Sequence, residues 1–380
     1  MRAGKEGRVL SVVAPRTEAL GACPLCDSTR RSIMFHSPDR LHGVSGEFTY
    51  QRCHDCRTVF QDPRVIAEDL PHCYPDEYMP HQSPDELLAP IATTKTDLSM
   101  RSRLRQAVMA AVRREPAGGV IGWLGEALAK SRHLRERAFH SCVIDEMLPF
   151  KLGAGCVLEV GCGAGQMLKA LTQVGWRVEG VEWDANAAEV ARRTSGQQVQ
   201  TGDFRQLDIP RERYDMVVLH HVLEHLPDLR SDLRKIEAIL APGGRAVLVY
   251  PNPDSLGAYV FRQNWVHWDP PRHLIMPPVR TLAKFANDSG LNLLRFRSSA
   301  RYAKWALTSS RLYRSRAAVK FTFQSITFPD RLLAFCEGAL IAMGFHLGEE
   351  LFVVLEKPRL SKPGQSREIA GLTSRSDQPA

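Results

Sequence analysis

The sequence predicts an α/β fold built on a doubly wound parallel sheet. Between residues 156 and 250, short runs rich in β-branched side chains alternate with amphipathic helical runs, as in a parallel sheet covered by helices. The first run leads directly into a glycine-rich turn, and two more strand-like runs follow after residue 290. The expected strands are residues 156–160, 177–181, 198–201, 216–220, 246–250, 291–297 and 351–355. The expected helices are residues 165–174, 185–194, 229–240 and 279–289.

Length and composition exclude several other classes of protein. With 380 residues, 44% of them hydrophobic and 24% charged, the chain is neither a disordered protein, a fibre nor a small disulfide scaffold. Its net charge of +8 suits anionic partners without choosing between nucleic acid, acidic lipid and a phosphorylated metabolite. The sequence shows no secretory leader pattern and no run of about 20 apolar residues that would span a bilayer. We therefore expect a cytoplasmic protein with reduced, buried or metal-bound cysteines.

The glycine turn is the strongest indication of a ligand site. Gly161, Gly163 and Gly165 follow a buried strand and open a helix, so the backbone can approach a nucleotide-like ligand closely. Glu182 ends the next strand, where a carboxylate can hold both ribose hydroxyls. Asp203 ends the third strand, where an adenine amine would lie. A glutamine stands where a dinucleotide-binding loop has its last glycine or alanine, and a doubly wound protein that binds NAD or no ligand is the alternative.

These residues together resemble the class I S-adenosylmethionine-dependent methyltransferases. Residues 159–165 match the acid-glycine loop of that family, and residues 215–221 match its fourth strand with the loop beyond it. The resemblance covers residues 156–355 and implies a seven-stranded doubly wound sheet with S-adenosylmethionine as the cofactor. The residues that it assigns to the cofactor are Glu159, Gly161, Gly163, Gly165, Glu182, Asp203, His220 and His221.

Two cysteine pairs near the N-terminus predict a metal site. Cys23 and Cys26 form one C-x-x-C pair, and Cys53 and Cys56 form a second. Two such pairs place four thiolates around one Zn²⁺ in a closed structural site, which contributes to folding and not to catalysis. A redox role for one pair is the alternative, although the thioredoxin-like unit that it requires is absent. The layout is similar to the zinc-ribbon module that precedes the core in bacterial sugar methyltransferases, where the module helps to close the substrate cleft.

The residues after the fourth strand are our candidates for catalysis. Methyl transfer to oxygen or carbon needs a group that removes a proton, and ligands of α/β proteins lie at this edge of the sheet. His225 is the expected base, and Glu224 the group that orients or charges it. Similar sugar C-methyltransferases use a histidine of this Leu-Glu-His motif with a tyrosine from the N-terminal module, which implies Tyr78, with Tyr74 in reserve. In related proteins the same motif is structural or binds a metal, which is the alternative.

A loop rich in proline and tryptophan follows the fifth strand. Sugar and polysaccharide-cluster methyltransferases carry a similar W-x-x-x-D-x-P-R-H-L loop at this place. Aromatic stacking and a guanidinium fork suit a glycosyl or nucleotide-sugar substrate. We therefore expect Trp265, Arg272 and His273 to bind the substrate. An ordinary lid with its tryptophans in a core is the alternative.

The preferred function is methyl transfer from S-adenosylmethionine to a small-molecule acceptor, a sugar that is nucleotide-linked or part of a glycoconjugate. An RNA base methyltransferase with a zinc ribbon is an alternative, but no Asn-Pro-Pro-Tyr motif follows the fourth strand. A quinone or lipid O-methyltransferase and a non-catalytic binding protein on the same frame are further alternatives. The expected parts are a zinc-binding module (1–82), a basic helical connector (83–150), the methyltransferase core (151–300), a helical insertion (301–348), the last core strand (349–358) and a disordered tail (361–380).

Two basic helical stretches lie outside the core. Residues 99–140 carry nine basic against three acidic residues, and residues 295–331 carry nine against one. An apolar run, Leu332–Gly344, follows the second stretch. Basic charge next to an apolar helix is typical of a surface that contacts anionic lipid, while ordinary solvated helices are the alternative. This predicts a weak, salt-sensitive contact with the inner face of a membrane. Nucleic acid is not an expected partner.

Overall fold

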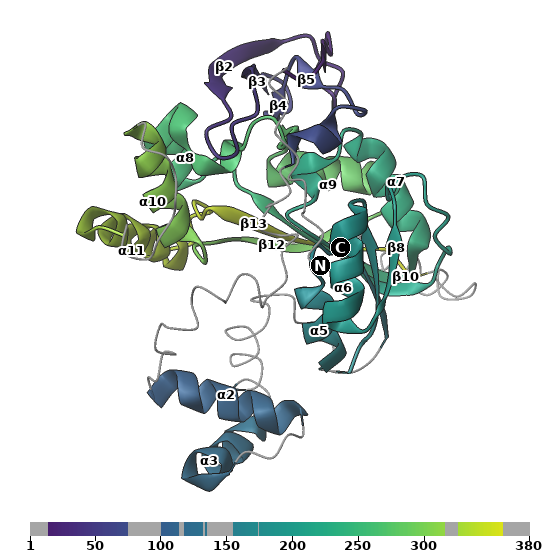
Figure 1. The fold of residues 1–380 in the computed structure, drawn as a ribbon, viewed down its shortest axis with the longest axis vertical. Coiled ribbons are helices and arrows are strands. Elements are labelled where there is room, and N and C mark those ends of the chain that lie inside the picture. Colours follow the sequence, from purple (N-terminus) through teal and green to yellow (C-terminus); the bar gives the residue numbers. More distant parts are fainter. Residues whose placement is uncertain are drawn as a thin grey trace, which may run out of the picture.

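The computed structural model describes residues 14–74, 100–113, 118–131, 134, 155–173, 175–315 and 326–359 of the chain. Figure 1 shows a central twisted sheet with helices around it, a small β-rich module above it, and a pair of helices below. In these described residues no helix is long and apolar enough to cross a membrane. The expected connector and tail, residues 83–150 and 361–380, lie largely or wholly outside the described residues.

The central sheet has seven strands in the order β12-β13-β10-β9-β6-β7-β8. β6, β7, β8, β9 and β10 run parallel to one another, while β13 lies between β10 and β12 and is antiparallel to both. The parallel part starts in the middle of the sheet, runs outward to β8 and returns to β9, which makes the sheet doubly wound. The strands are β6 (Cys156–Val160), β7 (Arg177–Glu182), β8 (Gln198–Thr201), β9 (Tyr214–His220), β10 (Leu240–Pro251), β12 (Asn292–Ser299) and β13 (Glu350–Glu356).

Alternate residues of each central strand belong to two different hydrophobic clusters. On β6, Leu158 packs with α7 (Leu229–Ile239) and α9 (Val279–Asp288). Its neighbour Val157 packs with α5 (Gln166–Gln173) and α6 (Ala185–Ser195) on the other face. Because successive side chains of a strand point to opposite faces, this pattern covers both faces of the sheet with helices. The predicted α/β class and all seven predicted strands are confirmed, with ends shifted by a few residues.

The segment after β10 contains more structure than the sequence predicted. Residues 251–278 were expected to form a loop, but they contain α8 (Leu256–Phe261), short helical turns and β11 (Ile275–Met276). β11 pairs with β4 (Val59–Gln61) of the N-terminal module. A strand of two residues gives no periodic pattern in the sequence, which explains why it was missed.

The N-terminal module is joined to the core through this pairing. Its sheet has the order β11-β4-β3-β2, where β2 spans Arg31–Pro38 and β3 spans Glu47–Cys53. The buried Tyr50 of β3 donates a hydrogen bond to the carbonyl of His273, at 2.9 Å, in the loop before β11. The module, coloured purple in Figure 1, therefore lies directly over the end of the core where the loops after β9 and β10 emerge.

The remaining described helices lie outside the sheet. α10 (Ala303–Arg314) and α11 (Phe328–Ala342) pack against each other beside β12. α2 (Met100–Arg113) and α3 (Gly119–Ala129) form a hairpin in which Gly125 lies against the backbone of Ala107. A β-carbon at Gly125 would come within 2.5 Å of that backbone, so only glycine permits this close approach.

Candidate functional site

The glycine turn between β6 and α5 is held in one conformation by its surroundings. Gly161 and Gly165 have φ values of +67° and +77°, in the left-handed region that favours glycine. A β-carbon at Gly161 would lie 2.5 Å from a methyl group of Val222, and one at Gly165 would lie 2.8 Å from Ala191. The turn thus brings the backbone close to the loop after β9, and neither glycine can be replaced without displacing a neighbour.

Glu182, the last residue of β7, is hydrogen-bonded to this turn. Its carboxylate accepts hydrogen bonds from the backbone N–H groups of Gly163, at 2.8 Å, and Asp184, at 3.1 Å. Burial raises the pKa of Glu182 although these two N–H groups favour its charged form. A carboxylate fixed at the end of β7 by backbone donors is positioned to accept hydroxyl groups of a ribose, so the residues fit an adenosyl cofactor.

Glu159 and Asp203 are the other two acidic residues expected at the cofactor. Glu159 is buried at the end of β6, and one of its oxygens has no hydrogen-bond partner among the described residues. Burial and the nearby Glu182 raise the pKa of Glu159 well above its usual range. Asp203 follows β8 and forms an ion pair with Arg205, with an O···N distance of 2.6 Å. The structure thus gathers these acids at the expected edge of the sheet, and their cofactor roles stay predictions.

His221 and the buried Glu224 form an ionic pair within the loop after β9. Nδ1 of His221 lies 3.1 Å from Glu224, and its Nε2 lies 2.7 Å from Glu350 of β13. Burial opposes a charged imidazole, but hydrogen bonds to the two carboxylates outweigh it and raise the pKa of His221 to about 10. Burial of Glu224 is outweighed in the same way by His221, and the pKa of Glu224 falls to about 2. His220, by contrast, stays neutral because burial and the charge of His221 lower its pKa to about 3.

His225 lies next to a tyrosine of the N-terminal module. Its Nδ1 is 2.9 Å from the hydroxyl of Tyr74 and 3.0 Å from the carbonyl of Arg272. Because a carbonyl only accepts hydrogen bonds, the second contact places a proton on Nδ1 and leaves the Nε2 lone pair available. Burial and the nearby His273 ring lower the pKa of His225 to about 4, so the imidazole is neutral at physiological pH. Tyr78, the tyrosine expected here first, lies outside the described residues.

Tyr74 also reaches towards the cofactor side of the site. Its ring centroid lies 5.2 Å from that of Trp183, which directly follows Glu182 on β7. Tyr74 was expected here only in reserve, and Trp183 was not expected, although the sequence shows an aromatic residue directly after Glu182. Glu350 was not predicted either, because nothing in the sequence of β13 shows that its carboxylate faces His221 in the loop after β9.

The three residues expected to bind substrate occupy different environments. Arg272 is fully buried, and its N–H groups are all bonded to Asp39, Asp269 and the carbonyls of Cys73 and Pro270. Trp265 is also buried, and its indole N–H donates to Glu349 at 2.6 Å. The structure therefore places both in the interior and leaves no donor of Arg272 for a ligand.

His273 is the one of these three that lies beside the catalytic candidates. Its Nδ1 is 2.7 Å from the carbonyl of His267, and its Nε2 is 3.8 Å from Glu224. Glu224, His225 and His273 each place one donor atom within 4.8 Å of the others. Two imidazoles and a carboxylate are a donor set that a divalent transition metal accepts, so the geometry is compatible with an ion as well as with proton transfer.

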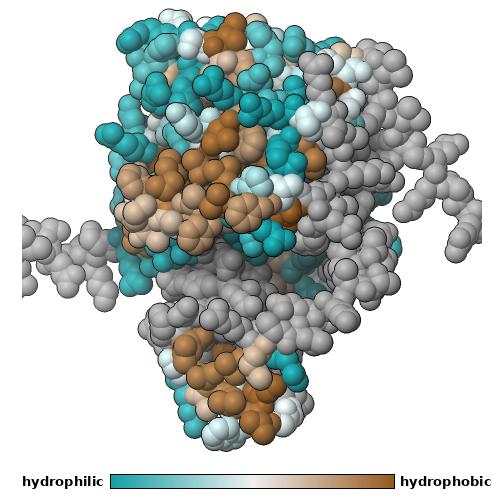
Figure 2. All heavy atoms as spheres, turned by 90° about the vertical axis from the view of Figure 1, so that its left-hand side faces the viewer, coloured by the Kyte–Doolittle hydropathy of each residue, from teal (hydrophilic) through white to brown (hydrophobic). Residues whose placement is uncertain are grey.

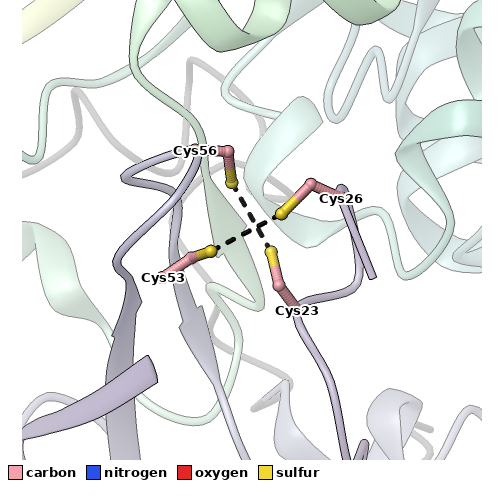
Figure 3. Close-up of side chains that lie close together, drawn as sticks. All are labelled: Cys23, Cys26, Cys53 and Cys56. Atoms are coloured by element: carbon pink, nitrogen blue, oxygen red, sulfur yellow. Dashed lines mark hydrogen bonds between the residues drawn. The ribbon is translucent and has the colours of Figure 1, made fainter. Parts of the chain in front are cut away.

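The four cysteines of the N-terminal module meet at one point. Figure 3 shows their sulfur atoms directed towards a common centre, with Cys23 opposite Cys56 and Cys26 opposite Cys53. These pairs of Sγ atoms are 3.6 Å and 3.5 Å apart. Four thiolates at about 2.3 Å from a tetrahedral Zn²⁺ lie about 3.8 Å from one another. The quartet therefore fits a zinc ion with little rearrangement.

Both halves of the quartet have the same backbone form. The residues that follow each pair, Asp27 and Arg57, have φ values of +59° and +65°. The N–H of each bonds back to the carbonyl of the first cysteine of its pair, Cys23 or Cys53. Thr281 of α9 donates a hydrogen bond to the carbonyl of Cys56, so the quartet is also tied to the core.

Known proteins resemble one part of this chain. Residues 131–295 match the family model of a methyltransferase domain. Ubiquinone biosynthesis O-methyltransferase of Bradyrhizobium sp. (strain ORS 278) is 34% identical over 96 residues, which cover 24% of this chain and 38% of that protein. The enzyme of the same name from Actinobacillus pleuropneumoniae serotype 7 is 32% identical over 98 residues, covering 23% and 42%. The chain thus spans about two fifths of the length of these curated relatives.

Solved structures are similar to this chain at lower sequence identity. Phosphoethanolamine N-methyltransferase 2 of Haemonchus contortus, in complex with S-adenosyl-L-methionine, is 18% identical with a TM-score of 0.41. The match covers 58% of this chain and 52% of that chain. The glycine turn, Glu182 and the loop after β9 all fall within the residues that the family model matches. The similarity to a methyltransferase domain therefore includes the residues that the sequence predicted for the cofactor site.

Proposed function

We propose that this protein transfers a methyl group from S-adenosylmethionine to a small-molecule acceptor. The observation that carries the proposal is the arrangement of Glu182, bonded to Gly163 of the glycine turn, next to the Tyr74–His225 pair. Trp183 connects Glu182 with the Tyr74–His225 pair, because it directly follows Glu182 in the sequence and its ring packs against that of Tyr74. S-adenosylmethionine supplies an electrophilic methyl group when bound, and Glu182 with the backbone of the glycine turn would hold it.

His225 removes the proton of the acceptor in this proposal. Its Nδ1 proton is bonded to the carbonyl of Arg272, so the lone pair of Nε2 is the basic site. The low pKa keeps the imidazole neutral, which is the form that accepts a proton. Tyr74 and the carbonyl of Arg272 fix the orientation of the His225 ring. Glu224, which precedes His225, is paired with the charged His221. The acceptor would therefore meet a preoriented base beside the proposed cofactor site.

A sugar is the acceptor class that we propose first. The N-terminal module contributes Tyr74 to His225, which is the role that the resemblance to sugar methyltransferases assigned to a tyrosine of this module. The buried positions of Trp265 and Arg272 do not support sugar binding by those two side chains. A phenolic hydroxyl is the second candidate, because curated relatives are named ubiquinone biosynthesis O-methyltransferase. We also propose that Cys23, Cys26, Cys53 and Cys56 hold one structural Zn²⁺.

The test combines cofactor binding with acceptor screening. The full chain is incubated with methyl-labelled S-adenosylmethionine and either a nucleotide-sugar pool or a set of polyhydroxylated phenols, and products are identified by mass spectrometry. We expect labelling of one pool, a loss of about 100-fold or more in His225→Ala, and unchanged cofactor affinity in that variant. His36→Ala, which changes a histidine of β2, is the matched control.

Three outcomes would contradict the proposal. Absence of S-adenosylmethionine binding in the wild type would contradict the proposed function. Normal turnover by His225→Ala would contradict the proposed role of His225 as the base. Loss of turnover with a chelator that leaves the cysteine-bound zinc in place would favour an ion at Glu224, His225 and His273 over proton transfer by His225.

A further inference from the structure

Helix α11 presents its apolar side to the surface and its acidic side to the protein. Phe328 and Phe335 are 76% and 72% exposed, and Leu332 between them is 51% exposed. A spacing of four and three residues places them on one side of the helix, and Met343, 67% exposed, continues the line just after the helix ends. We call these four residues the α11 face. Helices at a protein surface normally show the opposite arrangement, with the apolar side inward.

The two acidic residues of α11 explain this orientation. Asp330 accepts hydrogen bonds from Arg311 of α10, at 2.9 Å, and from the Thr327 backbone at the start of α11. Glu337 is buried and accepts the N–H of Glu349 at 3.0 Å. Both carboxylates therefore point inward with fixed partners, and the helix cannot turn its apolar side to the core without exposing them.

The exposed charged side chains of α10 and α11 are all positive. Within the described residues 300–315 and 326–347, Asp330 and Glu337 are the only carboxylates, and both are buried. Lys304, Arg314 and Arg331 lie exposed on α10 and α11. The face thus combines large apolar side chains with cations and without any exposed anion in this region.

A second apolar area lies on the same side of the molecule. Val120 and Trp123 of α3 are strongly exposed. Figure 2 shows hydrophobic side chains gathered in two places on one side, over the region of α8, α10 and α11 and over the hairpin of α2 and α3. A partner that covers both areas has to be broad and extended.

We propose that the α11 face docks onto the surface of a lipid bilayer that contains anionic lipids. Apolar side chains inserted at the headgroup boundary and cations that contact anionic headgroups are the two contributions that bind a peripheral helix to a membrane. A second copy of the chain fits less well, because Lys304, Arg314 and Arg331 would meet like charges.

The experiment measures binding of the full chain to vesicles of equimolar phosphatidylglycerol and phosphatidylcholine at low salt, with pure phosphatidylcholine vesicles beside it. We expect binding to the anionic vesicles and a partition coefficient lowered about tenfold by each of Phe328→Ser and Phe335→Ser. Charge reversal in Lys304→Glu and Arg331→Glu should lower it further and reduce the salt dependence. Ile33→Ser, at an exposed apolar residue of β2 in the N-terminal module, is the matched control and should bind as the wild type does.

Folding and self-association are measured on the same samples. All variants change exposed side chains, so unfolding temperatures close to that of the wild type are expected. The proposal is overturned if the wild type does not bind anionic vesicles, or if Phe328→Ser and Phe335→Ser bind as tightly as Ile33→Ser. A wild-type dimer that these two variants dissociate, without vesicle binding, would identify the α11 face as an interface between copies of the chain.

Discussion

The hydroxyl of Tyr74 and Nδ1 of His225 are hydrogen-bonded at 2.9 Å although 151 residues separate them in the sequence. Tyr74 follows the last helical turn of the N-terminal module, and His225 lies in the loop after β9 of the core. The contact therefore depends on how the module is seated on the core. The contacts that hold the module on the core include the pairing of β4 with β11 and the buried ion pair of Arg272 with Asp39, besides the hydrogen bonds of Tyr50 and Thr281.

Removing the Tyr74 hydroxyl should slow methyl transfer without loosening the cofactor. In Tyr74→Phe the ring remains against Trp183 while the hydrogen bond to His225 is lost. A hydrogen bond contributes about 1 kcal/mol net, so we expect kcat to fall roughly five- to tenfold with the S-adenosylmethionine affinity unchanged. Steady-state kinetics and calorimetry give the two quantities. Tyr259→Phe, at an exposed tyrosine of α8, is the control, and equal kinetics of the two variants would contradict a positioning role for Tyr74.

The sheet and the glycine turn could be predicted because their causes are local. Alternating apolar runs specify strands, and positive φ values at Gly161 and Gly165 require glycine, so both leave marks in the sequence. The contact of Tyr74 with His225 leaves no local pattern, because it arises from the docking of the N-terminal module, and only the resemblance to sugar C-methyltransferases suggested a tyrosine there, Tyr78 first and Tyr74 in reserve. β11 leaves no local pattern either, because its two residues pair with a strand more than two hundred residues earlier.

Removal of the proposed zinc should disrupt the contact between Tyr74 and His225, although neither residue is a zinc ligand. Cys56→Ser leaves three thiolates, and a structural zinc site contributes its binding energy to folding. The N-terminal module should then unfold before the core, which releases β4 from β11 and Tyr74 from His225. We expect metal analysis to give one zinc per wild-type chain and less in the variant, with an added early transition in thermal unfolding. Cys336→Ser changes an exposed cysteine of α11 and should keep both the metal and the single profile.

The environment of Arg272 differs from the ligand-facing one that the sequence suggested. An arginine after two prolines and near tryptophans suggested a guanidinium that binds a glycosyl or nucleotide-sugar substrate. In the structure Asp39, from the N-terminal module, takes two of its N–H groups and Asp269 takes two more. Asp39 lies 233 residues away in the sequence, so no local pattern identifies it as the partner.

Breaking this buried network should destabilise the fold strongly. Asp39→Asn leaves the fully buried Arg272 with one carboxylate, and removal of one partner from a buried ion pair costs about 3–5 kcal/mol. Chemical denaturation of Asp39→Asn should therefore have a midpoint at a lower denaturant concentration, and the N-terminal module should be bound less firmly to the core. Asp55→Asn, which breaks the exposed pair with Arg30, is the control and should change stability by less than about 1 kcal/mol. A substrate KM that rises in Asp39→Asn at unchanged stability would instead support the original substrate role of Arg272.

Asp232 of α7 should make stability depend on pH. The side chain is fully buried, and neither of its oxygens has a hydrogen-bond partner among the described residues. Burial raises its pKa to about 7, with smaller contributions from Asp228 and Asp203 against the opposing Arg205. Because the pKa is higher in the folded than in the unfolded protein, the protonated form stabilises the fold below about pH 4, and this contribution is lost as the pH rises through about 7.

Asp232→Asn tests this, since asparagine keeps the shape and cannot ionise. We expect the variant to be more stable than the wild type at pH 8 by about 2–4 kcal/mol, the difference to fall to about a third of that value at pH 5, and to approach zero only below about pH 4. Other buried acids, such as Glu337, titrate in both proteins, so the difference between variant and wild type isolates Asp232. Urea denaturation at several pH values measures it, with Asp208→Asn as the exposed control. A stability difference that stays constant from pH 5 to 8 would show that Asp232 does not titrate in this range, because a group that changes charge only in one state must produce a slope.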